Sequence, residues 1–306
     1  MGSSNRALLQ IHFCVLLWGF TAILGKLITL PALALVWWRT LLVSVLLLLL
    51  PRFWSGLRSL PPGLIRIYAG TGVVVALHWL TFYGSVKLAN ASVAATCMAL
   101  IPVCVAFVEP LLARRRFDVR EFVFGLAVIP GVVLVVGGTP SGMHLGIAVG
   151  VVSAFLAAVF GILNKRHIGQ SDVLTVTGIE IGAGALCVGL IYGVGLVWSG
   201  GASPLTGGEP LLALPGWRDG SLLLLLALGC TLLPFSLSLV ALRELSAFTT
   251  ALAVNMEPVY AVAMALLLLG EQRDLDLSFY AGVALIVVVV LTHSLLARRR
   301  RTPAVV

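Results

Sequence analysis

The sequence predicts an all-α integral membrane protein whose ten transmembrane helices form two inverted five-helix repeats. Three observations lead to this prediction: an apolar composition, ten apolar runs of spanning length, and a second half that resembles the first. Of the 306 residues, 60% are hydrophobic and only 10% are charged, and the mean hydropathy is +1.09. A soluble globular protein of this composition could not cover its surface with polar groups, so we expect a membrane protein.

Ten apolar runs supply the predicted helices. About twenty apolar residues are needed for a helix to cross a bilayer, and runs of this kind follow one another at 7–28, 32–50, 66–88, 91–113, 119–136, 143–163, 173–198, 217–242, 246–269 and 277–297. The first run leads into the second without a cleavage pattern, so we expect it to be retained. The longest connection, 199–214, contains Gly, Ser and Pro and is expected to be a loop. Tryptophans near run ends predict an interfacial aromatic belt: Trp37, Trp38, Trp54, Trp198 and Trp217.

The distribution of Lys and Arg predicts the topology. If the N-terminus is cytoplasmic and every run crosses, fifteen of the 20 basic residues lie inside and Arg39 lies within a span. Only Lys26, Lys87, Arg218 and Arg273 lie outside. The positive-inside rule therefore predicts a multi-pass protein of the plasma (inner) membrane with both termini cytoplasmic.

The positive net charge does not indicate nucleic-acid binding. The balance of +8 comes from clusters at the ends of apolar runs, where membrane topology explains them, so we expect no nucleic-acid partner. The five cysteines are scattered without a C-x-x-C pair and are typical of small buried residues, and no histidines cluster with metal-ligand spacing. No catalytic motif is present either, so we predict neither a cofactor nor an enzymatic activity.

The two halves of the chain resemble each other. Residues 20–26 align with 159–165, and a second alignment pairs Lys87 with Arg243 and Ile101-Pro102 with Glu257-Pro258. We therefore predict repeats at 1–139 and 140–306. Because five helices is an odd number, the copies must be inverted relative to each other, an arrangement that places a substrate site near the midplane between them.

Glu257 and Pro258 stand side by side in the middle of the run 246–269. A charged carboxylate at the bilayer centre costs roughly 2.5–3.5 kcal/mol, and the proline removes a backbone hydrogen bond. An apolar environment favours the protonated acid, so Glu257 could take up and release a proton; the alternative is a permanently protonated structural residue. Other prolines interrupt three further runs, either as static kinks or as flexible points at the site: Pro102, Pro130 and Pro234.

Arg39 and Glu180 lie at similar depths in equivalent runs of the two repeats. A guanidinium cannot lose its charge, so Arg39 needs a partner. The partner is either a permanent one, Glu180 or Glu257, or the carboxylate or phosphate of a substrate held by bidentate contact.

Aromatic and polar groups complete the candidate binding residues. His78 could relay protons or simply hydrogen-bond a neighbour, and Trp79 and Tyr83, one turn apart, form either a pocket wall or a helix contact. The remaining candidates are Trp18, Asn255 and Tyr260.

Several motifs resemble the EamA-type transporters of the drug/metabolite transporter (DMT) superfamily. They are Leu17-Trp18-Gly19-Phe20, Gly25-Lys26, Trp38-Arg39, Asn255-Met256-Glu257-Pro258-Val259, Leu269-Gly270-Glu271 and Tyr280-Ala281-Gly282. The chain departs from the family at Arg114-Arg115-Arg116, where the first repeat would show the same Gly-Glu. The resemblance implies a carrier of ten helices, and substrates in such families range from amino acids to nucleotide sugars.

We therefore predict a secondary transporter for a small polar metabolite, an amino acid or related compound exported by alternating access, with protons as a candidate coupling ion. Its expected partners are the small-molecule substrate and membrane lipids, and the oligomeric state stays open. The alternatives are a passive channel or facilitator and a membrane-embedded lipid-handling protein. A channel could not concentrate its substrate, whereas a coupled carrier would.

Overall fold

The computed structural model describes residues 3–113, 119–201, 206–254 and 256–299, with only the backbone described at helical residues 3–4, 120–122, 247–248, 251–252, 290–291 and 293–299. The described chain is helical and contains no strand. The first half comprises α1 (Ser3–Leu27), α2 (Ala32–Leu48), α3 (Pro51–Ser59), α4 (Pro62–Leu88), α5 (Ala91–Met98), α6 (Ile101–Leu112), α7 (Val119–Ala127) and α8 (Ile129–Gly137). The second comprises α9 (His144–His167), α10 (Val173–Trp198), α11 (Trp217–Leu224), the π-helix η4 (Leu225–Leu232), α12 (Leu233–Glu244), α13 (Ala247–Val254), α14 (Glu257–Leu268) and α15 (Leu277–Arg299). Short 3-10 turns lie at η1 (Ser141–Met143), η2 (Ile168–Gln170) and η5 (Glu271–Arg273).

Every predicted apolar run is helical, but not every run is one long helix. Six segments of the described chain are long and apolar enough to cross a membrane, and α2 with α3 would make a seventh although they meet at 85°. The other runs form shorter apolar helices at Val123–Gly137, Glu257–Leu268 and Leu277–Val289. The structure thus bears out an all-helical protein with six to seven candidate spans.

The helices are interrupted or change type at all four prolines where the sequence predicts it. Pro102, Pro130, Pro234 and Pro258 are each the second residue of a helix that starts after a break or a change of helix type: α6, α8, α12 and α14. Proline lacks the N–H that would continue the preceding helix, and its ring clashes with the carbonyl four residues earlier, while its fixed φ suits the first turn of a new helix. The breaks at Pro102 and Pro258 are equivalent in the two halves.

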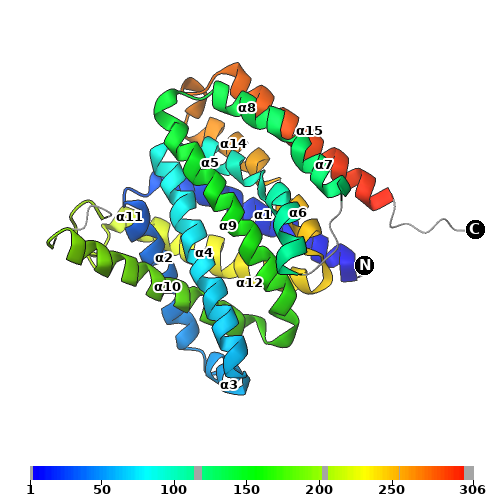
Figure 1. The fold of residues 1–306 in the computed structure, drawn as a ribbon. Helices are drawn as coiled ribbons and strands as arrows, with labels where there is room; N and C mark the ends of the chain where they lie inside the picture. Colours follow the sequence, from blue (N-terminus) through cyan, green and yellow to red (C-terminus); the bar gives the residue numbers. More distant parts are fainter. Residues whose placement is uncertain (1–2, 114–118, 202–205, 255, 300–306) are drawn as a thin grey trace, which may run out of the picture.

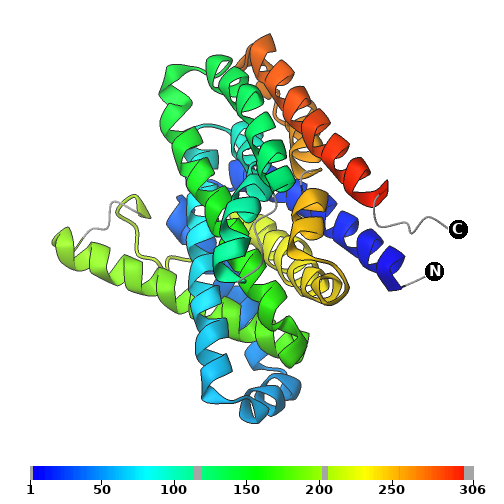
Figure 2. The same ribbon diagram turned by 45° about the vertical axis from the view of Figure 1, so that its right-hand side comes forward.

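The helices of the two halves pack in an exchanged pattern. α1 packs along α12 and α14, and the equivalent helix α9 packs along α4 and α6. α2 packs on α10, and α8 on α15 (Figures 1 and 2). Each half therefore packs its first helix against helices of the other half, as the internal repeat leads one to expect. The start of α1 and the end of α15 lie on the same side in both views.

Glycine permits two of these crossings. A Cβ on Gly72 of α4 would lie 2.1 Å from the backbone oxygen of Glu180 in α10. At the crossing of α8 and α15, a Cβ on Gly282 would lie 2.5 Å from the backbone oxygen of Gly131. Because no side chain fits at such distances, these helices can only approach so closely through glycine.

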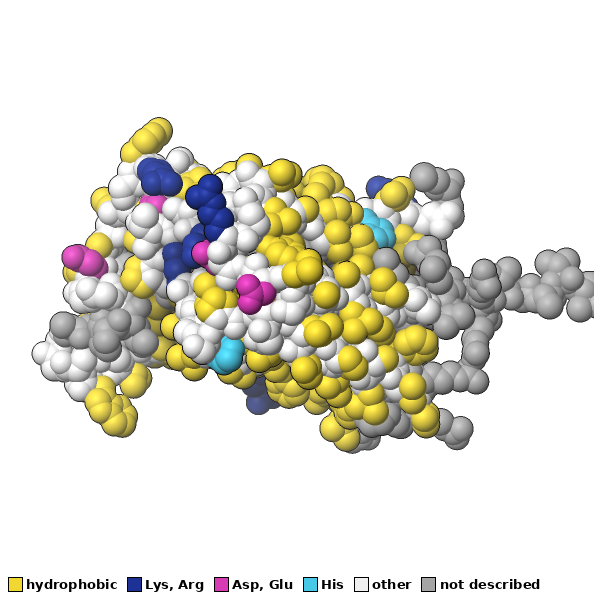
Figure 3. Space-filling model, turned by 90° about the horizontal axis from the view of Figure 1, so that it is seen from above, with side chains coloured by type: hydrophobic (Ala, Val, Ile, Leu, Met, Phe, Trp, Pro, Cys, Tyr) yellow, Lys and Arg dark blue, Asp and Glu magenta, His cyan; other side chains and the backbone are white. Residues whose placement is uncertain are grey.

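The outer flank is apolar, as a lipid-facing surface should be. Leu186, Leu190 and Val197 of α10 are 70% or more exposed. In the view from above, hydrophobic side chains cover much of the surface, and charged ones gather over one part of it (Figure 3). Trp198 and Trp217 are about nine-tenths exposed at helix ends, in agreement with the predicted interfacial belt.

Candidate functional site

A cavity lies between the two helical runs that are broken at Pro102 and at Pro258. Its cavity volume is about 110 Å³, which is room for several water molecules or a small ligand. Its walls are aromatic and aliphatic, with a few polar groups among them. The lining residues are Trp18, Thr21, Arg39, His78, Trp79, Phe82, Met98, Ile101, Val105, Ala157, Phe160, Gly161, Thr231, Phe235, Ser238, Leu242, Thr250, Val254 and Glu257.

The lining follows the internal repeat. When the two sequence alignments are continued without gaps, many lining residues pair with one another: Trp18 with Ala157, Thr21 with Phe160, Trp79 with Phe235, Phe82 with Ser238, Met98 with Val254, and Ile101 with Glu257. The rings of Trp79 and Phe235 also meet, with centroids 6.1 Å apart. The cavity therefore lies at the interface of the two repeats, where inverted-repeat transporters bind substrate.

Arg39 is the buried cation of this cavity. It is only 2% exposed, its Nε donates to Thr231 Oγ1 at 2.7 Å, and its Nη1 donates to the Tyr83 hydroxyl at 2.9 Å. The guanidinium carbon stands 3.8 Å from the centroid of the Trp79 ring. The cation is thus held by hydroxyls and by an aromatic face.

The ion pairs considered for Arg39 are not formed. Within the described residues, neither Glu180 nor Glu257 lies within salt-bridge distance of it, whereas Arg52 and Asp172 do form an ion pair. For Arg39 the permanent pairing that the sequence suggested is therefore wrong. The reason is geometric, because α10 turns Glu180 toward α9, where it accepts a hydrogen bond from Asn164.

Glu257 is the carboxylate of the cavity. It is the first residue of α14, directly before Pro258, and is 6% exposed. No hydrogen bond to its side chain is present within the described part of the chain. The helix break thus presents an acid to the same space that Arg39 lines.

The other predicted residues separate into three groups. Trp18, His78 and Trp79 line the cavity, and His78 Nδ1 contacts Ser153 Oγ at 2.9 Å. Tyr83 and Tyr260 do not line it: Tyr83 supports Arg39 from behind, and Tyr260 packs where α14 meets Gly19 of α1. Glu180 lies outside the cavity as well, and Asn255 lies outside the described residues.

Sequence reasoning missed Thr231 and Phe235, which contact Arg39 and Trp79. Phe235 could have been found by extending the repeat alignment from Trp79. Thr231 could not, because it belongs to the π-helix η4, and a wide helical turn leaves no clear signal in the sequence.

Beyond one end of the cavity, here named the capped end, two carboxylates join the two halves of the chain. Asp219 of α11 accepts hydrogen bonds from the N–H and the hydroxyl of Thr29, at 3.1 and 2.6 Å. Glu271 accepts from the N–H of Ala91, the N–H of Ser92 and the Ser92 hydroxyl, at 3.0, 2.9 and 2.6 Å. Glu271 therefore caps the N-terminus of α5, a helix of the other repeat, and both acids are buried.

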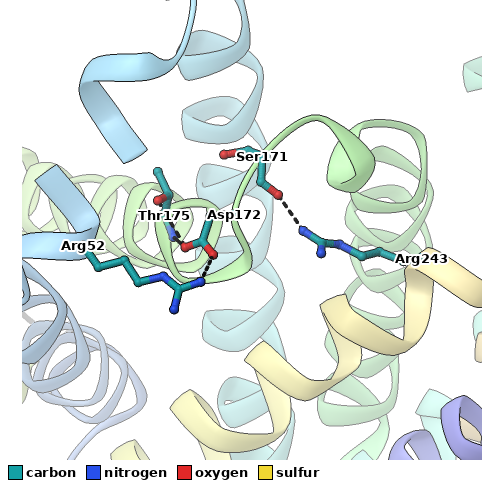
Figure 4. Close-up of polar contacts among 5 residues, drawn as sticks. All are labelled: Arg52, Ser171, Asp172, Thr175 and Arg243. Carbon is teal, nitrogen blue, oxygen red and sulfur yellow. Dashed lines mark hydrogen bonds and ion pairs between the residues drawn. The ribbon is translucent and has the colours of Figure 1, made fainter. Parts of the chain in front are cut away.

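The opposite end, here named the basic end, is held by exposed arginines. Arg52 of α3 pairs with Asp172 at 2.7 Å, and Arg243 of α12 donates to the Ser171 carbonyl at 2.6 Å (Figure 4). Partial burial acts to raise the pKa of Asp172, but the hydrogen bonds from Arg52 and from the Thr175 N–H outweigh it, so the pKa is lowered. The Arg52 side chain is 70% exposed, so this contact is far weaker than the buried caps.

The cavity extends toward the basic end. Its lining reaches Leu242, two residues before the end of α12, and Thr250 in the first turn of α13. Toward the capped end it stops at Thr21 and Phe82, each six residues before its helix ends. Six residues of helix are about 9 Å, and α6 and α9 extend about as far beyond Val105 and Gly161. It is therefore α12 and α13 that bring the cavity within one turn of the basic end.

Comparison with known proteins identifies the family. The sequence pattern of the EamA-like transporter family matches residues 5–137 and again residues 144–294. The chain belongs to the EamA-like transporter family. The match confirms the predicted membership of the DMT superfamily and points to a membrane transporter rather than an enzyme. The predicted repeat boundary between residues 139 and 140 falls in the gap between the two matched stretches.

The fold is shared with a solved structure. One chain, described only as the crystal structure of a protein, is 17% identical in sequence, with a TM-score of 0.66 over 97% of this chain and 99% of the other. At this identity the likeness establishes the fold of the EamA protein and nothing about its substrate. No curated protein matches the sequence.

Proposed function

We propose that this EamA-family protein is a secondary active transporter that exports a small amphiphilic zwitterion, an amino acid or a related metabolite, by alternating access. The observation that carries the proposal is that Arg39 and Glu257 line one cavity at the repeat interface without pairing with each other. A buried charge without an oppositely charged partner is costly, so both groups suit a ligand that brings the opposite charges.

The polar groups match the two ends of a zwitterion. Arg39 is held rigidly by Thr231, Tyr83 and Trp79, so its planar fork is prepared for a carboxylate. Glu257 would accept the ammonium group. The aromatic and aliphatic walls, including Phe160, would contact an apolar side chain.

Proton coupling follows from the same chemistry. In an empty apolar cavity a carboxylic acid is cheaper than a carboxylate, whereas binding an ammonium group requires the charged form. A proton and the substrate amine would therefore compete for Glu257. Competition for one site is the simplest basis for exchange of substrate against protons.

The direction follows from the two ends of the cavity. The positive-inside rule would place the basic end, with Arg52 and Arg243, in the cytoplasm together with both termini. All ten helical runs would then cross the inner membrane. A cavity extending toward that end would load from the cytoplasm, and opening of the capped end would release substrate outside.

The test is counterflow in proteoliposomes. Purified protein is given radiolabelled phenylalanine, leucine or threonine against the same unlabelled compound, with putrescine and succinate as probes carrying only one kind of charge. We expect counterflow of at least one amino acid and of neither control probe. Counterflow of putrescine or succinate alone, or of none of the five, would overturn the zwitterion proposal.

Two variants test the proposed roles. Arg39→Lys keeps the charge but loses the planar fork, and we expect at least a tenfold rise in KM. Glu257→Gln should retain a folded protein but lose the pH dependence of transport. Glu209→Gln, at an exposed position of the 199–214 connection, is the matched control and should behave as the parent. Unchanged pH dependence in Glu257→Gln would exclude this residue as the coupling group.

A further inference from the structure

A second buried acid lies outside the cavity and has an incomplete hydrogen-bond arrangement. Glu180 of α10 is 0% exposed and Asn164 of α9 is 2% exposed. Asn164 Nδ2 donates to Glu180 Oε2 at 3.2 Å. The other oxygen of each side chain, Glu180 Oε1 and Asn164 Oδ1, is buried and has no partner.

The chemistry of these two oxygens indicates what is missing. A carboxylate has only acceptors, and the amide oxygen is also an acceptor. Two neighbouring side chains, already joined through their other atoms, thus each leave an acceptor unsatisfied in a buried interface, which is unfavourable. A single proton on Oε1 would remove both defects, because the resulting O–H could donate to Asn164 Oδ1 and close a cyclic acid–amide pair.

We propose that the Glu180–Asn164 pair is a proton-binding site, separate from the substrate cavity, that is occupied in this conformation. Binding converts the carboxylate and one proton into a neutral carboxylic acid, and release reverses this. The ligand is a proton rather than a metal ion, because no group of three or more His, Cys, Asp or Glu in the described residues could hold a metal.

No cation of the neighbouring helices neutralises Glu180. In the described part of the chain Glu180 forms no ion pair, and five charged or titratable groups of the surrounding helices have other partners: Tyr68 of α4 with the His167 carbonyl, Arg39 of α2 with Thr231 and Tyr83, Arg52 of α3 with Asp172, Lys165 of α9 with the Leu242 carbonyl, and Arg243 of α12 with the Ser171 carbonyl. On the α4 side, the backbone of α10 at Glu180 lies against Gly72. A proton is therefore the charge that balances the carboxylate.

The site is linked to the cavity through α9. Asn164 stands one helical turn after Phe160, and residues four apart share a face of the helix. Phe160 lines the cavity. This step rests on the proposed alternating access. Movement of α9 relative to α10 would separate Asn164 from Glu180, expose the acid to water and release its proton. The pair would then act in coupling in addition to Glu257.

Infrared difference spectroscopy tests the bound proton without depending on transport. We expect the parent protein near pH 7 to show a C=O band of a protonated carboxylic acid, shifted in D₂O, that is lost in Glu180→Gln and kept in both Glu257→Gln and Glu209→Gln. The double variant Asn164→Asp/Glu180→Gln rebuilds the pair with the acid on α9 and should restore a band. A spectrum of the parent that does not differ from that of Glu180→Gln would overturn the proposal.

Transport separates this inference from the proposed function. Counterflow of the amino acid that the parent carries tests the carrier itself, and accumulation driven by a pH gradient tests coupling. In Glu180→Gln we expect the ratio of gradient-driven accumulation to counterflow to fall at least tenfold. An unchanged ratio would overturn the coupling role of Glu180, whereas absence of counterflow in the parent would overturn the proposed function and leave the infrared result to decide on the proton.

Discussion

Replacement of Glu271 should open the capped end. In Glu271→Gln the side chain keeps one acceptor oxygen, and its NH₂ group must face a backbone N–H of Ala91 or Ser92, both of which the carboxylate now accepts from. Hydrogen bonds to a charged acceptor contribute about 1.5–3 kcal/mol each, and the negative charge at the N-terminus of α5 adds about 0.3–1 kcal/mol. We expect the closed state to lose about 2–3 kcal/mol relative to states in which this end is open.

The size of this loss sets the size of the effect. Because each 1.4 kcal/mol is a factor of ten, the open population should rise about 30- to 150-fold. The reporter is Thr96→Cys in a background without the five native cysteines. Thr96 lies between the cap and the cavity and is 3% exposed, so its alkylation by a water-soluble maleimide follows opening.

Two controls make the measurement decisive. Ser92→Ala removes only the hydroxyl bond to Glu271 and keeps the charge and both backbone bonds, so its effect should be smaller, about tenfold, from about 1.5 kcal/mol. Glu209→Gln removes an exposed charge and should leave the alkylation rate unchanged. If Glu271→Gln reacted no faster than Glu209→Gln while remaining folded, the cap would not hold this end closed.

Two further predictions concern stability. Gly72→Ala should destabilise the protein by about 1–3 kcal/mol, because its Cβ would meet the backbone of Glu180, whereas Gly70→Ala, with nothing within 4 Å, should not; thermal unfolding in detergent compares the two, and equal losses would contradict the close packing. Arg52→Ala should cost at most about 1 kcal/mol because its pair with Asp172 is exposed. Since the pKa of Asp172 is lowered, its contribution is present above its unfolded pKa of about 3.9 and is lost as the pH falls through the folded value, so unfolding followed from pH 7 to 3 should show the Arg52→Ala deficit shrinking.

Much of the architecture can be predicted because its signals are local. Apolar runs, proline breaks and tryptophans at helix ends each depend on a few neighbouring residues and on their contact with lipid or water. The same holds for Glu257, because an acid in the middle of an apolar run stands out in the sequence alone. The equivalence of Pro102 and Pro258 is also visible in the sequence, and both prolines stand at helix breaks in the structure.

The partners of the buried polar groups cannot be predicted in this way. A carboxylate was a natural partner to expect for Arg39, yet this residue lies on Trp79 and donates to hydroxyls of Tyr83 and Thr231. A partner depends on how each helix is rotated about its axis and where it crosses its neighbour. Neither quantity follows from depth in the membrane, which is all that a position in an apolar run specifies.

The amino-acid sequence was therefore sufficient for the membrane class, the two repeats, the helix breaks and the family, because apolar length, proline chemistry and motif order act along the chain. Tertiary structure alone decided that Arg39 and Glu257 share a cavity, that Glu180 lies outside it with Asn164, and that Glu271 caps α5. These contacts join residues far apart in sequence, and they depend on helix rotation and on glycine-mediated crossings such as the one at Gly72.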